Sequence, residues 1–271
     1  MKKIALITGI SGQDGSYLAE FLLEKGYYVH GIVRRQSTAE NQESRLENVE
    51  GLVETYYGDL TDVPSLTRLV TTIKPTHIFN LGAMSHVRIS FDIPSYTIQT
   101  NGLGVLNLLE VYREFVPEAK FYQASSSEMF GNSFDEDKFQ RETTPMNPVS
   151  PYGCGKLLAY SLVRHYRNAY GLHACNGILF NHESPRRGSN FVTNKVVKAA
   201  VQIKLGLLDK LELGNMDSYR DWGHSKDYTE AMIRIINHET PDDFVVSTGE
   251  THSVRDLCEV VFNYLDMNYE E

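Results

Sequence analysis

Cysteine is scarce in this 271-residue chain, and the three that occur, Cys154, Cys175 and Cys258, are odd in number. None of them forms a CxxC pair or a Cys/His spacing typical of a metal site. The sequence therefore predicts neither a disulfide framework nor a metal centre, and it fits a reducing compartment. We interpret the three cysteines as packing residues.

Long apolar runs and excess positive charge are also missing. The start, MKKIALITGISG, has only a short apolar run before Gly9, too short for a signal-peptide core, and no later stretch reaches transmembrane length. The formal net charge is −9, which argues against general binding to nucleic acid or an anionic membrane, although a local basic pocket is compatible with it. We expect a cytoplasmic protein with a small-molecule substrate and neither nucleic acid nor a membrane as partner.

Apolar runs of strand length alternate with amphipathic stretches of helix length over the first half of the chain. The strand-like runs are 4–7, 29–33, 53–57, 78–81 and 121–124, and the helical patterns between them are 17–25, 66–73 and 105–115. Gly26 and Pro75 follow two of the helical patterns, as is common at helix ends. This alternation predicts an α/β fold, a Rossmann-type doubly wound parallel sheet built from βαβ units.

After Gly131 the pattern changes to a polar loop over 132–151, a helix over 152–170 and a strand over 173–180. From residue 181 loops are more frequent, with helices near 193–205 and 227–237 and a third that begins at the capping box Ser253-Val-Arg-Asp256. We expect a nucleotide-binding domain over 1–180 and a smaller, partly interleaved substrate-binding lobe over 181–271.

A glycine-rich turn follows the first strand-like run. Thr8-Gly-Ile-Ser-Gly-Gln-Asp-Gly15 is a GxxGxxG pattern that leads into a helix, and such glycines let a pyrophosphate approach the helix N-terminus. Gly9, Ser11, Gly12, Gln13, Asp14 and Gly15 are therefore the expected cofactor residues of this turn. The spacing differs from GxGxxG, so an ordinary strand-to-helix turn remains an alternative.

The second strand-like run ends in Arg34-Arg35, where NAD-type sites usually have an acid for the ribose hydroxyls. Two guanidinium groups suit a 2′-phosphate, which favours NADP over NAD. A solvated basic pair is the alternative. Asp59-Leu60 is in a position to flank the adenine, although a plain turn explains it equally well.

Tyr152 and Lys156 are four residues apart on the expected helix over 152–170, so their side chains share a face. The lysine ammonium can lower the pKa of the phenol and also reach the cofactor ribose. Ser126 lies at the end of a strand, where it can hydrogen-bond a substrate hydroxyl or carbonyl beside Tyr152. Hydride transfer needs only these groups, so the acid Glu128 after the serines calls for a further role.

The chain resembles the GDP-mannose 4,6-dehydratase family of extended short-chain dehydrogenases/reductases over essentially its whole length. The resemblance rests on the motifs at 9–15, 34–35, 123–128 and 152/156, the run ACNGILFNHESPRRG at 174–188, RDWGHSKDY at 220–228 and TGETHSV at 248–254. It implies tightly bound NADP, a GDP-mannose substrate and a homodimer or homotetramer. Members of this family usually continue beyond the position of residue 271, so either the lobe is truncated here or it is a minimal one.

The resemblance also implies roles for single residues. Ser126, where the family usually has threonine, would relay protons and polarise the sugar; Glu128 would be the acid and base of dehydration. Tyr152 would be the base of oxidation, with Lys156 as its partner. The remaining implied residues are Leu81, Ala83, Ser85, His182 and Arg187 for the cofactor and Ser85, Ser126, Glu128, Asn181, Lys195 and Arg220 for the sugar nucleotide.

Two other functions remain open from the residues. A reductase of a GDP-4-keto-6-deoxy sugar would share the fold, the cofactor and the Tyr/Lys pair, but it would have no use for Glu128. A non-catalytic NADP-binding module would have no reason to combine Ser126, Glu128, Tyr152 and Lys156. The sequence therefore favours the dehydratase.

Overall fold

The computed structural model describes residues 2–35 and 44–270 and divides the chain into two compact units. The larger unit comprises Met1–Leu179 and Lys226–Val246, and the smaller comprises Phe180–Ser225 and Ser247–Glu271. Residues 226–246 thus belong to the larger unit, whereas a boundary at residue 180 assigns them to the lobe. The chain crosses between the units three times.

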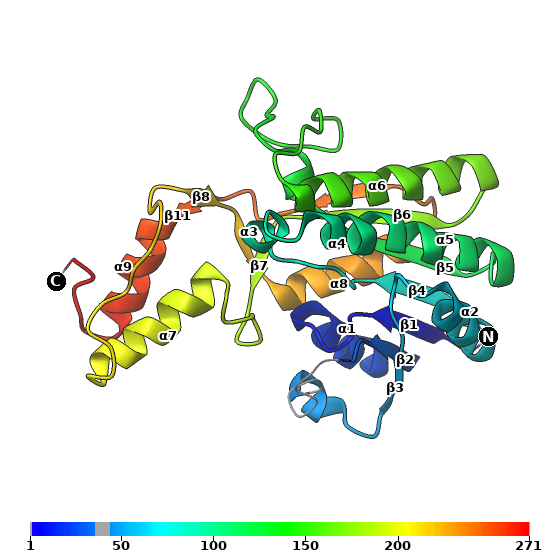
Figure 1. Cartoon of the computed structure of the whole chain (residues 1–271), viewed down its shortest axis with the longest axis horizontal. Helices are drawn as coiled ribbons and strands as arrows, with labels where there is room; N and C mark the ends of the chain where they lie inside the picture. The colour runs from blue at the N-terminus through cyan, green and yellow to red at the C-terminus, as the bar shows by residue number, and fades with distance from the viewer. Residues whose placement is uncertain (1, 36–43, 271) are drawn as a thin grey trace. The chain divides into compact units, whose positions relative to one another are not determined.

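A seven-stranded parallel sheet forms the centre of the larger unit (Figure 1), with the order β10-β6-β5-β4-β1-β2-β3. Its strands are β1 (Ile4–Thr8), β2 (Tyr28–Val33), β3 (Val53–Tyr57), β4 (His77–Asn80), β5 (Lys120–Ser126), β6 (Ala174–Leu179) and β10 (Asp243–Val246). The order reverses at β1, where the chain moves to the other half of the sheet. This topology confirms the Rossmann-type doubly wound sheet.

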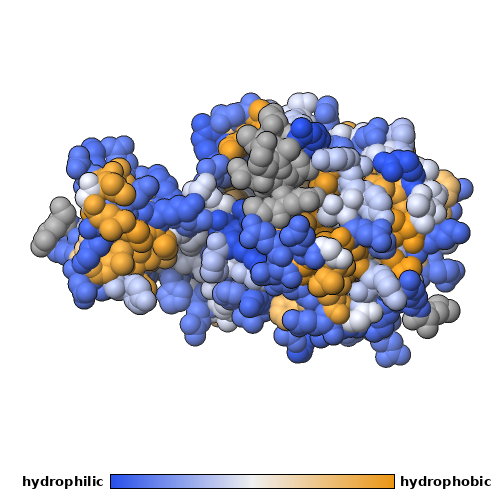
Figure 2. Space-filling view, turned by 90° about the horizontal axis from the view of Figure 1, so that it is seen from below, coloured by the Kyte–Doolittle hydropathy of each residue, from blue (hydrophilic) through white to orange (hydrophobic). Residues whose placement is uncertain are grey.

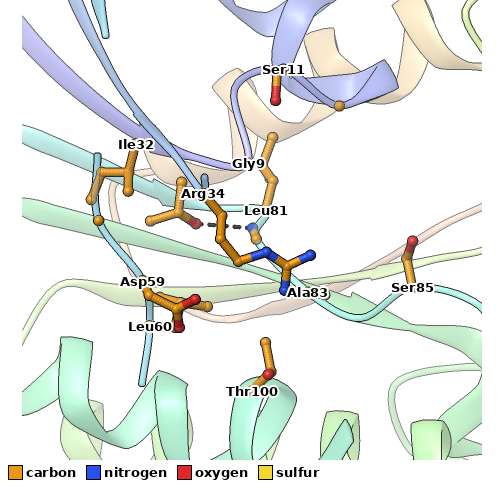
Figure 3. Close-up of a pocket in the computed structure, with 14 residues that line it drawn as sticks. Gly9, Ser11, Ile32, Arg34, Asp59, Leu60, Leu81, Ala83, Ser85 and Thr100 are labelled. Carbon is orange, nitrogen blue, oxygen red and sulfur yellow. Dashed lines mark hydrogen bonds between the residues drawn. The ribbon is translucent and has the colours of Figure 1, made fainter. Parts of the chain in front are cut away.

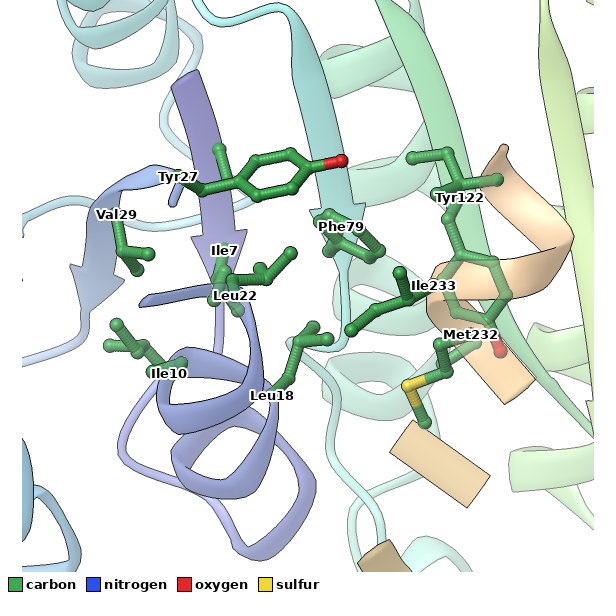
Figure 4. Packing of buried hydrophobic residues seen from close by; sticks show 14 of the residues in the cluster. Ile7, Ile10, Leu18, Leu22, Tyr27, Val29, Phe79, Tyr122, Met232 and Ile233 are labelled. Atoms are coloured by element: carbon green, nitrogen blue, oxygen red, sulfur yellow. The ribbon is translucent and has the colours of Figure 1, made fainter. Parts of the chain in front are cut away.

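Successive residues of the central strands alternate between two hydrophobic cores, one on each face of the sheet. Ile7, Phe79 and Tyr122 pack with α1 (Gln13–Glu24) and α8 (Ser225–Ile236) on one face (Figure 4). Leu6, Ile78 and Phe121, one residue earlier on each strand, pack on the other face. The helices of that second face are α2 (Val63–Ile73), α5 (Gly104–Phe115) and α6 (Pro151–Tyr170).

The helix ends follow from local sequence. Gly26, after α1, takes a left-handed φ of +76°. At the start of α2, the Asp62 side chain accepts a hydrogen bond from the Ser65 amide at 3.1 Å, and α2 ends at the left-handed Lys74 just before Pro75. These observations confirm the helix ends that the sequence predicts at Gly26 and Pro75.

The sequence did not predict the helical segment before α5. It consists of α3 (Val87–Ser90), α4 (Pro94–Ile98) and a π-helical turn over Gln99–Leu103 that continues directly into α5. The short 3₁₀ helix Ser44–Val49 was also missed. Both segments are too short, or too irregular, for a 3.6-residue apolar period to be visible.

The smaller unit has its own hydrophobic core. Val196 and Ala200 of α7 (Val192–Lys204) pack with Cys258 and Phe262 of α9 (Val254–Tyr264). Two short pairings complete it, β7 (Asn181–Glu183) with β9 (Trp222–His224) and β8 (Tyr219–Arg220) with β11 (His252–Ser253). The capping box at Ser253 and Asp256 is present, as the sequence predicts.

Apolar side chains are also exposed on both units, as the orange areas in Figure 2 show. On the smaller unit, α7 exposes Val197 and Val201, and α9 exposes Val260 and Tyr264. The interpretation of the cysteines is wrong for Cys154, which lies exposed on α6, whereas Cys175 and Cys258 are buried. None of the described helices is long and apolar enough to cross a membrane.

Candidate active site

The glycine-rich turn between β1 and α1 has a backbone that only small residues permit. Gly9 has a φ of +71°, and a Cβ on Gly15 would lie 2.3 Å from the Gly9 carbonyl oxygen. Gly12 caps α1 without a side-chain hydrogen bond. The turn therefore packs tightly against the start of α1. Its backbone amides and the positive end of the helix dipole are available to an anionic ligand group.

A pocket opens beside this turn at the carboxyl ends of β1, β2, β3 and β4 (Figure 3). Many of the expected cofactor residues line it: Gly9, Ser11, Gly12, Arg34, Asp59, Leu60, Leu81, Ala83 and Ser85. Gln13, Asp14 and Gly15 follow in the first turn of α1 and do not line it. The sequence reasoning missed the lining residues Thr8, Ile32, Gly58, Gly82 and Thr100.

Buried hydrogen bonds fix the floor of this pocket. The Thr8 hydroxyl donates to Asn80 Oδ1 at 2.5 Å and accepts from the Gly82 amide at 2.9 Å, the bond dashed in Figure 3. The Asn80 side-chain amide donates in turn to Gln123 Oε1 at 2.7 Å. These bonds tie the ends of β1 and β4 to the middle of β5, so the loop 81–85 leaves the sheet at a fixed place.

The two arginines after β2 do not share one position. Arg34 lines the pocket, and its guanidinium carbon lies 5.7 Å from the centre of the Tyr96 ring. Arg35 is not among the lining residues. The Asp59 carboxylate lines the pocket and also accepts hydrogen bonds from the Thr61 amide and hydroxyl at 2.8 and 2.7 Å. Asp59 therefore both stabilises a turn and contributes to the pocket, so the two alternatives from the sequence do not exclude each other.

The carboxylate that follows the serines sits on a single 3₁₀ turn at the end of β5. Ser126 is the N-cap of this turn, and its hydroxyl accepts a hydrogen bond from the Glu128 amide at 3.2 Å. Ser126 is buried and Glu128 half-buried. The strand end thus places a hydroxyl and a carboxylate two residues apart, with the backbone between them constrained.

Helix α6 begins directly against this turn. Ser150 caps it by accepting from the Gly153 amide at 3.0 Å, and Pro151 occupies its first turn. A Cβ on Gly153 would lie 2.7 Å from the Glu128 carbonyl oxygen, so glycine at 153 allows the close approach. Tyr152 therefore enters the site next to the turn that carries Glu128.

Lys156 lies one turn further along α6 and is 5 % exposed. Its ammonium donates a hydrogen bond to the Ala124 carbonyl at 2.7 Å and lies 5.7 Å from the centre of the Tyr152 ring. Burial lowers the pKa of Lys156 to about 8, although the negative charge of Asp14 acts in the opposite direction. The Tyr/Lys pair on one helix face is present, and its lysine is costly to keep charged.

The cost of charging Lys156 predicts a pH dependence of stability. Between the pKa of about 8 in the folded protein and the ordinary value of 10.5, the unfolded chain binds the proton and the folded chain does not, so this group raises the free energy of unfolding as the pH rises. The free energy of unfolding of Lys156→Met, relative to that of wild type, should therefore be highest below pH 8. This difference should fall by roughly 3 kcal/mol between pH 8 and about pH 10.5. Urea denaturation of both ligand-free proteins from pH 7 to 10.5 measures it, and parallel curves would contradict it.

The other expected ligand residues belong to the smaller unit. His182 Nδ1 lies 2.7 Å from the Phe180 carbonyl oxygen, and Arg187 pairs with Glu183 at 3.1 Å and stacks at 3.6 Å over the Phe191 ring. Lys195 donates to the Glu212 carbonyl at 2.7 Å and lines a pocket that also contains Lys198 and Lys210. Asn181, on β7, and Arg220, on β8, do not line that pocket.

The motifs RDWGH and TGETHSV, far apart in sequence, meet in this unit. The Asp221 carboxylate is 5 % exposed and accepts hydrogen bonds from the Thr248 amide and hydroxyl and from the Gly249 amide at 2.8–3.1 Å. His252 pairs with Arg220 in the adjoining two-stranded ribbon. Asp221 thus holds the 248–249 turn beside Arg220, a role that sequence reasoning did not foresee.

The doubly wound sheet, the glycine turn after β1 and the Tyr/Lys pair on the helix after β5 define a short-chain dehydrogenase/reductase of the extended type. The family model described as GDP-mannose 4,6 dehydratase matches residues 6–271. The chain belongs to this family, as its motifs predict.

Curated relatives and solved structures agree with this assignment. A GDP-mannose 4,6 dehydratase of Cricetulus griseus is 52% identical over 97% of this chain and 73% of its own length, and one of Vibrio cholerae is 50% identical over 96% and 71%. The fold is similar to UDP-glucose 4-epimerase of Thermus thermophilus in complex with NAD, with a TM-score of 0.84 and 27% identity over 98% of this chain and 84% of that one. It is also similar to dTDP-glucose 4,6-dehydratase of Streptomyces venezuelae, with a TM-score of 0.86 and 21% identity over 98% and 82%.

Proposed function

We propose that this chain converts GDP-mannose to GDP-4-keto-6-deoxymannose and water, as a lyase that keeps NADP tightly bound. The observation that carries the proposal is the half-buried residue Glu128, which lies two residues after Ser126 at the end of β5 and whose backbone packs against the helix of Tyr152 and Lys156. An oxidation alone does not require that carboxylate, whereas an elimination does. Family membership supports the same reaction.

The pocket beside the glycine turn suits a dinucleotide. Part of its wall is glycine backbone at Gly9, Gly12, Gly58 and Gly82, and one side presents the cation of Arg34. We infer that Arg34 selects NADP through its 2′-phosphate. When bound, the nicotinamide would take a hydride from C4 of the sugar and return it to C6, so it ends each cycle as it began and has no need to leave.

The residues of the chain supply the proton transfers. Tyr152 would accept the proton of the sugar O4 during oxidation, and the nearby ammonium of Lys156 would stabilise the phenolate. Ser126 would polarise the same oxygen. Once C4 is a ketone the C5 proton is acidic, and Glu128 would remove it and then protonate O6 as it departs as water.

In this proposal the smaller unit supplies the ligands for the sugar nucleotide. Asn181, Lys195 and Arg220 would hold it, with the two cations at the diphosphate, and His182 and Arg187 would contact the cofactor. We also propose a cytoplasmic location and a homodimer or homotetramer. The segment 34–45 is our candidate for part of the subunit interface near the cofactor, and its residues 36–43 lie outside the described residues.

Arg34→Gln should weaken NADP binding by about tenfold to a hundredfold, since a hydrogen bond to a charged group contributes about 1.5–3 kcal/mol. NAD lacks the 2′-phosphate, so its affinity should change little. Arg35→Gln is the matched control, because Arg35 does not line the pocket, and it should have the smaller effect. Calorimetric titration of both cofactors measures the difference, and equal losses for NADP and NAD would refute the assignment.

The proposed reaction is tested by incubating the purified protein with GDP-mannose and no added reductant. The product should be lighter by one water. A protein that leaves GDP-mannose intact, but consumes added NADPH with a GDP-4-keto-6-deoxy sugar, would instead be the reductase.

A further inference from the structure

Thr100 is a pocket residue to which no role has been assigned. It lies in the π-helical turn Gln99–Leu103 between α4 and α5 and lines the pocket beside the glycine turn. Only 6 % of the residue is exposed, and its hydroxyl has no hydrogen-bond partner among the described residues. An unpaired buried hydroxyl costs free energy, so its retention at a binding pocket calls for an explanation.

Two other helical threonines of this chain satisfy their hydroxyls within the helix. Thr97, three residues earlier, donates to the Ile93 carbonyl at 2.9 Å, and Thr71 donates to the Thr67 carbonyl at 2.7 Å. This back-bonding to the fourth preceding carbonyl is the ordinary solution for a buried threonine in a helix. The Thr100 hydroxyl makes no such hydrogen bond. Unlike Thr97 and Thr71, Thr100 lies in a π turn, which is wider than an α-helical turn.

The pocket that Thr100 lines contains the cation of Arg34, which suits an anionic ligand group, as well as the carboxylate of Asp59. Arg34 lines the same pocket, and Figure 3 shows its side chain extending between the loop at Ala83 and the helix that carries Thr100. Tyr96, which the Arg34 guanidinium approaches at 5.7 Å, precedes Thr100 by four residues on the same helical segment. The helical segment that carries Thr100 therefore also contacts Arg34, through the Tyr96 ring.

We propose that the Thr100 hydroxyl donates a hydrogen bond to an oxygen of the cofactor 2′-phosphate that Arg34 neutralises. The inference rests on the proposed function, because it takes NADP as the occupant of the pocket. It makes Thr100 a second determinant of NADP selectivity, from the wall opposite β2. Binding then completes a hydrogen bond that the ligand-free protein leaves unmade.

The test compares Thr100→Val, Thr100→Ser and Thr97→Val. Valine has the shape of threonine without the hydroxyl, and serine keeps the hydroxyl. Thr97→Val makes the same change on the same helical segment, at a buried hydroxyl that does not line the pocket. The dissociation constants of NADP and NAD are measured by calorimetry, and the Tm of each ligand-free protein is measured by calorimetric scanning.

Thr100→Val should bind NADP about tenfold to a hundredfold more weakly than wild type, with little change for NAD. Its ligand-free Tm should stay equal or rise, because the substitution removes an unpaired buried polar atom. Thr100→Ser should keep most of the NADP affinity. Thr97→Val should leave both dissociation constants unchanged and lower the Tm, because it removes a hydrogen bond that is already made.

Equal losses of NADP and NAD affinity in Thr100→Val would overturn the assignment to the 2′-phosphate. Unchanged affinity for both cofactors would overturn the contact itself. A lower ligand-free Tm would also contradict the proposal, since it would mean that the hydroxyl already has a partner. If wild type binds neither cofactor, the proposed function fails; if wild type prefers NADP and Thr100→Val keeps that preference, only the role of Thr100 fails.

Discussion

Tyr152→Phe is expected to lower turnover of GDP-mannose by about 10²–10⁴-fold, the usual contribution of a positioned proton-transfer group. Tyr152 is 9 % exposed, in the first turn of α6, with the Lys156 ammonium 5.7 Å from its ring centre. Phenylalanine keeps the ring and its packing and removes only the hydroxyl that would accept the O4 proton. The affinities for NADP and GDP-mannose should therefore change little.

Steady-state kinetics and calorimetric binding on the same preparation separate these effects. Tyr160→Phe is the control: Tyr160 is a buried tyrosine of the same helix, and burial raises its pKa to about 12, so its hydroxyl stays protonated at neutral pH. This variant should keep near-normal turnover. Turnover that survives in Tyr152→Phe would place the base on another residue.

Glu128→Gln should separate oxidation from dehydration. Glutamine keeps the length and much of the hydrogen bonding of glutamate but cannot accept the C5 proton. Water loss should slow by about 10²–10⁴-fold, while oxidation at C4 still occurs. Reduced cofactor should then accumulate on the enzyme after mixing with GDP-mannose, and C5 should take up little deuterium from heavy water.

Stopped-flow absorbance of the nicotinamide and mass analysis of the sugar nucleotide measure the two steps. Glu136→Gln, an exposed acid of the loop after β5, should behave like wild type. If Glu128→Gln dehydrates at a near-normal rate, the carboxylate would serve only the structure of the strand end, and the reductase would regain support.

The sequence predicted the central sheet well because its signals are local. The apolar runs at 4–7 and 53–57 match β1 and β3 closely, and Gly26 and Pro75 lie just beyond helix ends. The strand β10 was missed because only Phe244 to Val246 are apolar and the preceding aspartates resemble a loop. That strand places 226–246 in the larger unit, and no local pattern reveals a pairing with β6 across more than sixty residues.

The candidate site was predictable where a motif lies at a strand end. Gly9 and Asp59 each follow a strand of the sheet, and both line one pocket; Leu81, which the family resemblance implied, lines the same pocket. Thr100 could not be found in this way, because its position depends on a π turn that has no sequence period. The separation of Arg34 from Arg35 likewise depends on how the chain leaves β2.

The most direct test of the proposed reaction follows the hydrogen on C4. Equal amounts of unlabelled GDP-mannose and GDP-mannose carrying deuterium at both C4 and a ring carbon that does not react are converted together, without added reductant. The account predicts a product that has lost one water and has the C4 deuterium at C6, only in molecules that also carry the ring label. A product without deuterium at C6, or deuterium spread to molecules without the ring label, would contradict it.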